Sequence, residues 1–155
     1  MKRNYWMAVL LLMLVMLLFY SCVDTAMPYS LRQSTEHIVA VRFLNGQKFD
    51  DASKTYEIIT QMELEQGLTF IEELRKIECR KAFPLDTPVG FGEVIVEITY
   101  ANGEVEMIGC DNNGWITPDG QWEYDSYYFD LESFYALLSQ YVDESYFPVA
   151  WHIKK

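Results

Sequence analysis

The stretch that decides the fold is Val94-Ile95-Val96-Glu97-Ile98-Thr99-Tyr100-Ala101-Asn102-Gly103-Glu104. Large apolar side chains stand at every second position from Val94 to Tyr100, which is typical of a β-strand with one buried face. The dipeptide Asn102-Gly103 favours a two-residue type I′ turn. The stretch therefore predicts a β-hairpin.

A two-residue turn fixes the pairing of the hairpin. Tyr100 is then expected opposite Val105 and Ile98 opposite Met107 on a buried face, while Thr99 opposes Glu106 on the polar face. A slip by one residue would turn every side chain to the other face and bury Glu106. We therefore expect Glu106 to lie on the solvent-facing side of the hairpin. The opposed pair Ile95 and Cys110 is expected on the same side.

Further strands and helices follow on both sides of the hairpin. Residues 38–43 are rich in β-branched and aromatic side chains and end at Asn45-Gly46, and turns at residues 112–114 and 118–120 continue the sheet as a meander. Apolar side chains recur at helical spacing over residues 64–74 and 131–141, the second run after Asp130 as a helix cap. The predicted class is α+β, an antiparallel sheet of about four to six strands with two amphipathic helices on one face.

The N-terminus has the form of an export leader. Lys2 and Arg3 precede an unbroken apolar run over residues 5–20, and Ser21 and Cys22 follow. Leu18-Phe19-Tyr20-Ser21-Cys22 resembles a bacterial lipobox, which predicts lipidation of Cys22, although Phe19 and Tyr20 depart from that pattern. An uncleaved signal anchor is the main alternative, since the run approaches the ~20 residues that cross a bilayer. Cleavage and release is the third.

The three cysteines are Cys22, Cys79 and Cys110. An odd number in an exported protein assigns a separate role to one of them. Lipidation of Cys22 would leave Cys79 and Cys110 as a possible disulfide pair. Two reduced thiols within the fold are the alternative.

Length and charge limit the organisation and the partners. The chain has 155 residues and a formal net charge of −11, and the leader contributes only cations. We predict a leader or anchor over residues 1–22, a polar tether over 23–36 and a single domain over 37–155. So acidic a surface repels phosphate backbones, which argues against nucleic acid as a partner.

The order of these features resembles small uncharacterised lipoproteins of Gram-positive bacteria. The likeness rests on the lipobox-like leader, the segment Ile98-Thr99-Tyr100-Ala101-Asn102-Gly103-Glu104 and the closing helix with Phe134-Tyr135-Ala136-Leu137-Leu138. It covers most of the chain as a pattern and includes no diagnostic motif. The resemblance implies an exported α+β domain on the extracytoplasmic side of the cell membrane and transfers no catalytic residue.

Few residues in the sequence point to chemistry. His37 and His152 are the only histidines, and neither has a second ligand at metal-binding spacing. No nucleophile elbow or phosphate-binding loop occurs. We therefore expect no metal, no cofactor and no enzymatic activity, with an exported enzyme of unrecognised type as an alternative.

One group of aromatic residues is a candidate binding surface. It comprises Trp115, Trp122, Tyr124 and Tyr127, with acidic and amide side chains between them. Such residues anchor protein interfaces, and flat rings also stack on sugars. The sequence thus predicts a membrane-tethered binding domain for a protein partner, or alternatively for cell-wall glycan. Packing of the same aromatics under a helix remains the competing interpretation.

Overall fold

The computed structural model describes residues 9–14, 26–81, 91–109, 113–125, 127–149 and 152. Residues 9–14 are helical. The strands are β1 (Met27–Pro28), β2 (Ile38–Asp50), β3 (Thr55–Gln61), β4 (Glu78–Lys81), β5 (Val94–Tyr100), β6 (Val105–Ile108), β7 (Asn113–Ile116), β8 (Trp122–Asp125) and β9 (Tyr127–Phe129). The helices are α2 (Leu64–Leu74) and α3 (Leu131–Leu138), with 3₁₀ turns η1 (Thr35–His37) and η2 (Glu144–Tyr146).

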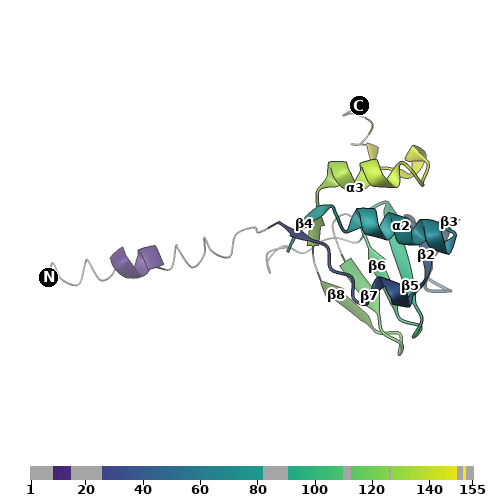
Figure 1. Cartoon of the computed structure of the whole chain (residues 1–155), viewed down its shortest axis with the longest axis horizontal. Coiled ribbons are helices and arrows are strands. Elements are labelled where there is room, and N and C mark those ends of the chain that lie inside the picture. Colours follow the sequence, from purple (N-terminus) through teal and green to yellow (C-terminus); the bar gives the residue numbers. More distant parts are fainter. Residues whose placement is uncertain are drawn as a thin grey trace.

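The strands form two antiparallel sheets (Figure 1). The larger has six strands in the order β3-β2-β5-β6-β7-β8, and the smaller has three in the order β1-β4-β9. The predicted α+β class is confirmed, but the single sheet of about four to six strands is corrected to two sheets. The second sheet was not foreseen because its first strand comes from the segment that the sequence analysis assigned to a tether.

The β5–β6 hairpin forms in the register that the sequence analysis rejected. Thr99 pairs with Val105 and Ile98 pairs with Glu106. The loop has three residues, because Tyr100 N–H donates to the Glu104 carbonyl over 2.9 Å, and Gly103 has φ +85°. This is the turn with a glycine bulge rather than the two-residue type. The extra residue moves Glu106 to the same face of the sheet as Ile98.

The other Asn-Gly dipeptide, Asn45-Gly46, does not form the predicted turn. Strand β2 continues through Asn45 and Gly46 to Asp50, and Gly46 N–H donates to the Glu93 carbonyl over 2.8 Å. A Cβ atom on Gly46 would lie 2.0 Å from the carbonyl oxygen of Gly92. The glycine therefore allows close approach of two backbones, which replaces the predicted break in the strand.

The helices cover one face of the large sheet, which we call the helix face. Its buried strand residues include Val41, Val96, Ile98 and Ile108, and they share one apolar cluster with α2 and α3. Figure 1 shows α2 running across the strands with α3 beside it. We call the opposite side the outer face; its smaller cluster consists of Leu44, Phe91, Ile95 and Met107.

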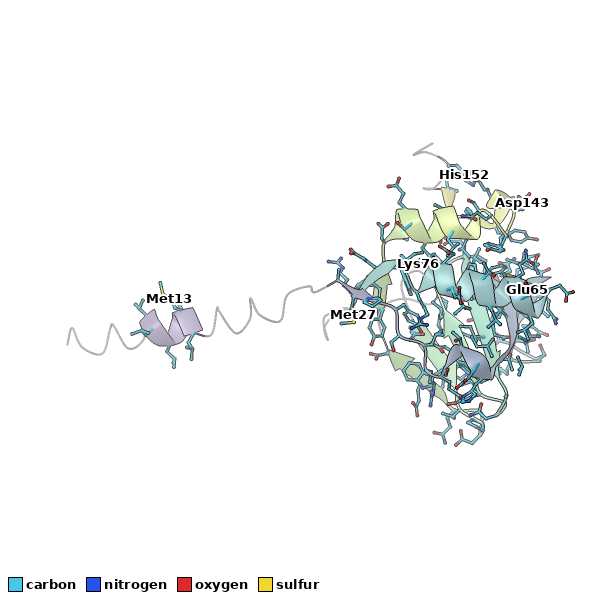
Figure 2. All side chains as sticks on the ribbon, in the orientation of Figure 1. Met13, Met27, Glu65, Lys76, Asp143 and His152 are labelled. Carbon is cyan, nitrogen blue, oxygen red and sulfur yellow. The ribbon has the colours of Figure 1, made fainter. Side chains whose placement is uncertain are left out.

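The segment predicted as a polar tether is part of the fold. Met27 pairs with Cys79 and Pro28 with Glu78, and Tyr29 is only 2% exposed within the main core. Figure 2 shows Met27 at the edge of the folded part. We call residues 27–33 the N-terminal strap. The folded part therefore includes residues before position 37, because the large aromatic side chain of Tyr29, eight residues earlier, lies in the core.

Candidate functional site

The most unusual buried group is the carboxyl of Glu106. Its side chain is 0% exposed on the helix face, where its neighbours across the sheet are Ile98 and Trp115. A carboxyl removed from water requires hydrogen-bond partners, since an unpaired buried ion is very costly. Its partners come from the strap as well as from the sheet.

The two oxygens of Glu106 are shared between two tyrosines and one backbone amide. Tyr29 O–H contacts Oε1, and Tyr100 O–H contacts Oε2. The Arg32 backbone N–H donates to Oε2 over 3.1 Å. Tyr29 Oη also lies 2.6 Å from Asn113 Oδ1. Among the described residues, no cation makes a hydrogen bond to this carboxyl.

Burial changes the protonation of this cluster. Removal from water is the largest cause that raises the pKa of Glu106, and the hydrogen bonds from Tyr100 and Tyr29 oppose it only in part. Burial also raises the pKa of Tyr29 and of Tyr100, next to the Glu106 carboxyl. Both phenols therefore stay protonated, and the cluster favours the neutral acid of Glu106.

A second group of polar contacts holds Arg32 and Gln33, the last two residues of the strap. Arg32 Nε lies 2.7 Å from Glu104 Oε1, and the guanidinium stacks 4.7 Å from the centre of the Trp115 ring. Gln33 Nε2 also donates to Glu104. The indole N–H of Trp115 donates to Glu123 Oε2 over 2.8 Å. The strap is thus held by side chains from the turn, β7 and β8.

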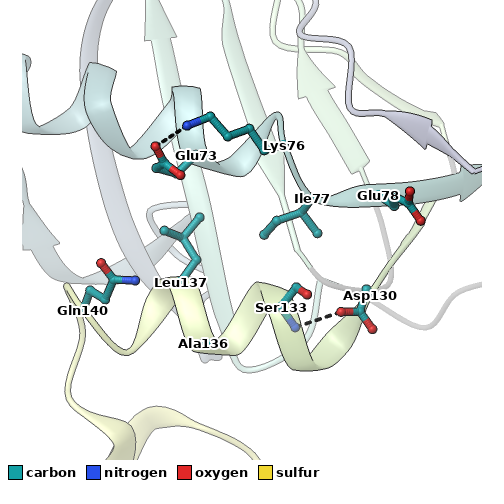
Figure 3. A pocket seen from close by; sticks show the side chains of 9 residues that line it. All are labelled: Glu73, Lys76, Ile77, Glu78, Asp130, Ser133, Ala136, Leu137 and Gln140. Atoms are coloured by element: carbon teal, nitrogen blue, oxygen red, sulfur yellow. Dashed lines mark hydrogen bonds and ion pairs between the residues drawn. The ribbon is translucent and has the colours of Figure 1, made fainter.

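A groove lies between α2 and α3 (Figure 3). Its cavity volume is about 490 Å³, within the ~300–1,000 Å³ usual for binding pockets. Three acidic side chains, Glu73, Glu78 and Asp130, stand around it with one cation, Lys76. The remaining lining residues are Ile77, Ser133, Ala136, Leu137 and Gln140.

Three of the four charges around this groove are already engaged. Lys76 Nζ forms an ion pair with Glu73, and the Asp130 carboxylate accepts the Ser133 backbone N–H over 3.0 Å as the cap of α3. Figure 3 draws both contacts. The groove therefore offers an acidic rim, two buried apolar side chains, Ile77 and Leu137, and the polar ends of Ser133 and Gln140.

The predicted aromatic residues whose side chains the structure describes do not gather into one surface. Trp115 lies on the helix face under Arg32, whereas Trp122 is 36% exposed on the outer face beside Phe91. Tyr127 is half-buried, and its ring meets Tyr29 edge-on at 6.2 Å between centroids. The side chain of Tyr124 lies outside the described part. The two tryptophans therefore cannot form a single flat platform.

The predicted cysteine sites are described only in part. Cys79 is a buried free thiol that donates to the Met27 carbonyl over 3.4 Å, and burial raises its pKa. Cys110, its predicted disulfide partner, and Cys22, the predicted lipidation site, lie outside the described residues. The thiol of Cys79 helps to fix the strap against β4.

The histidines were the sequence candidates for a metal centre. His37 is exposed, and Glu36 Oε1, on an exposed neighbour, lies 3.8 Å from its Nε2. In the described ranges no group of three potential metal ligands comes together. Within the same ranges, no helix is long and apolar enough to cross a membrane.

Sequence reasoning missed the Glu106 cluster. Tyr29 and Glu106 are 77 positions apart, so no local pattern connects them. The one available signal was a large aromatic residue, Tyr29, in an otherwise polar segment.

Comparison with protein families, curated proteins and solved structures returned no match to this chain.

Proposed function

We propose that this chain is an exported, non-enzymatic binding domain, held at the outer side of the membrane by its leader, whose partner is a protein. The observation that carries the proposal is the groove between α2 and α3, with its acidic rim and apolar floor. The resemblance to small Gram-positive lipoproteins agrees with the membrane attachment.

The groove favours a partner of particular chemistry. Ile77 and Leu137 offer apolar contact to one or two small side chains, because both are buried but line the cavity. Glu78 stands at the rim, exposed, and favours a positive charge next to that apolar side chain. We therefore propose that a partner segment with lysine or arginine beside a small aliphatic residue docks between the two helices.

The position of the strap supports action close to the membrane. The proposed lipidated Cys22 is only a few residues before Met27, where β1 begins. An extended chain spans at most ~3.6 Å per residue. The domain would thus remain within about 20 Å of the bilayer surface, which points to membrane proteins as partners.

Membrane attachment is tested by the intact mass of the full chain purified from membranes of a Gram-positive host. Loss of residues 1–21 with a diacylglyceryl group on Cys22, or a full-length unmodified chain, would both support a tether. A cleaved chain without lipid, recovered only from the culture medium, would refute it.

The groove is tested by a photo-crosslinking amino acid placed in the full chain in cells. Ala136 is the test position, and Leu131, exposed on the same helix but outside the groove, is the matched control. We expect a discrete protein adduct from position 136, at least tenfold weaker from 131, and lost with Glu78→Lys. Equal adducts at both positions, or an adduct insensitive to Glu78→Lys, would contradict the docking site.

A further inference from the structure

We propose that Glu106 is a proton-dependent latch, which holds the N-terminal strap on the sheet while its carboxyl is protonated and loosens the strap when it ionises. The step is a simple acid dissociation, in which the proton passes to bulk water and no other bond breaks. The strap joins the folded domain to the leader, so the latch would control the distance between the two.

The first argument is the number of protons available in the cluster. Tyr29 has one hydroxyl hydrogen, but its oxygen contacts two acceptor atoms, Glu106 Oε1 and Asn113 Oδ1. With Glu106 protonated, its O–H donates to Tyr29, and Tyr29 donates to Asn113. Every close oxygen pair then contains one hydrogen, as a buried network requires.

Ionisation removes one hydrogen from this chain of contacts. Tyr29 must then choose between the carboxylate and Asn113 Oδ1, and one of the two close oxygen pairs becomes repulsive. The charge of Arg32 opposes the rise in the pKa of Glu106 only in part, and its guanidinium makes no hydrogen bond to this carboxyl but pairs through Nε with Glu104. The ionised state is therefore relieved by moving Tyr29, and the strap with it.

The second argument is the set of charged and titratable groups around Glu106. These groups come from the strap and from the strands and turn that surround Glu106. On the strap, the nearby cation is the side chain of Arg32. The groups are Tyr29 and Arg32 on the strap, Tyr100 on β5, Glu104 in the hairpin turn, Glu123 on β8 and Tyr127 on β9. Glu72 of α2 and the two residues that follow this helix, Arg75 and Lys76, line a pocket with Tyr29.

The pH range of the latch follows from the direction of the shift. A carboxyl whose pKa is raised on folding gives stabilisation that is complete below its unfolded value and is lost as pH rises through the folded value. Burial raises the pKa of Glu106 from 4.5. The strap should therefore be held firmly in mildly acidic solution and more loosely as pH increases. Release of seven residues would lengthen the connection to the leader by about 25 Å.

Hydrogen exchange of the full chain in detergent micelles tests the proposal. Backbone amides of residues 29–33 are followed between pH 5 and pH 8, after correction for the intrinsic exchange rate. We expect their protection to fall at least tenfold in the wild type and less than twofold in Glu106→Gln, which has a permanently neutral side chain. Glu97→Gln, a buried carboxyl on the outer face, is the matched control and should retain the wild-type dependence.

Equal pH dependence in the wild type and in Glu106→Gln would overturn the latch, as would constant protection in the wild type. If Glu106→Gln does not fold, infrared spectroscopy of the wild type decides. A carbonyl band of a protonated carboxylic acid should persist above pH 5 and disappear together with the strap protection. Absence of that band throughout would also overturn the proposal.

Discussion

The two faces of the six-stranded sheet each bury a glutamate, and they satisfy it in different ways. On the outer face Glu97 is 7% exposed and accepts hydrogen bonds from Arg42, one of them 2.7 Å from Nε. On the helix face Glu106 is fully buried and has only neutral donors. A cation stabilises the ionised form, whereas phenols and an amide leave the neutral acid as the more stable form. The same residue type thus serves as half of an ion pair on one face and as a proton-dependent contact on the other.

The largest expected effect is the loss of the neutral cluster. Glu106→Ala would leave the Tyr100 hydroxyl buried without its acceptor, would remove the O–H that donates to Tyr29, and would open a cavity. We expect a loss of about 4 kcal/mol in the free energy of unfolding, measured by urea denaturation at pH 6. A loss below about 1 kcal/mol would show that water enters the space left by the carboxyl and satisfies the buried hydroxyls.

Removal of the cation on the outer face should have a smaller effect. Arg42→Met keeps the aliphatic contacts but leaves the Glu97 carboxylate without its partner. Because the Arg42 side chain is 32% exposed, solvent screens the pair, and we expect a loss of about 2 kcal/mol. Urea denaturation at pH 8 measures it. The double variant Arg42→Met with Glu97→Gln should recover part of that loss, and failure to recover would argue against an ion pair as the cause.

Substitution of each buried glutamate by glutamine should change the free energy of unfolding in opposite directions on the two faces. At pH 8, Glu97→Gln loses the charged pair and should destabilise the chain by about 1 kcal/mol. Glu106→Gln removes a carboxyl whose ionisation is unfavourable in the fold, so it should be neutral or stabilising relative to the wild type at pH 8 and become less favourable towards pH 5. The free energy of unfolding at the two pH values tests this. Destabilisation of the same size by both variants would remove the distinction between the faces.

The smallest effect is expected from a single hydroxyl. Tyr29→Phe retains the ring packing against Phe129 but removes the phenol shared by Glu106 and Asn113. We expect a loss of about 1 kcal/mol at pH 6, with hydrogen exchange increased in residues 29–33 more than in α2. A uniform increase over the whole domain would mean that the strap does not open separately.

The main elements could be predicted because their signals are local. The β5–β6 hairpin, the helix over residues 64–74 and the cap at Asp130 each depend on a short pattern, and the structure contains all three. The hairpin register could not be predicted in the same way. Two-residue and three-residue loops both favour a glycine with positive φ at Gly103, and a difference of one loop residue moves Glu106 from solvent to the core.

The candidate sites depended even more on distant contacts. Trp115 and Trp122 were considered together because they are close in sequence, but strand alternation places them on opposite faces. The groove lies between the end of α2 and the length of α3. Each of its acidic rim residues, Glu73, Glu78 and Asp130, is an ordinary surface carboxylate when it is considered alone. Nothing in either segment predicts the other, because the two helices are far apart in the sequence and only folding packs them side by side.

The sequence by itself determined the α+β class, the hairpin and the two amphipathic helices, since periodicity and turn residues are properties of adjacent residues. Only the tertiary structure decided that Tyr29 belongs to the core and that Glu106 is buried. The physical reason is that a buried carboxyl is tolerated only where donors surround it. Those donors come from residues 29, 32 and 100 of the chain, which folding brings together.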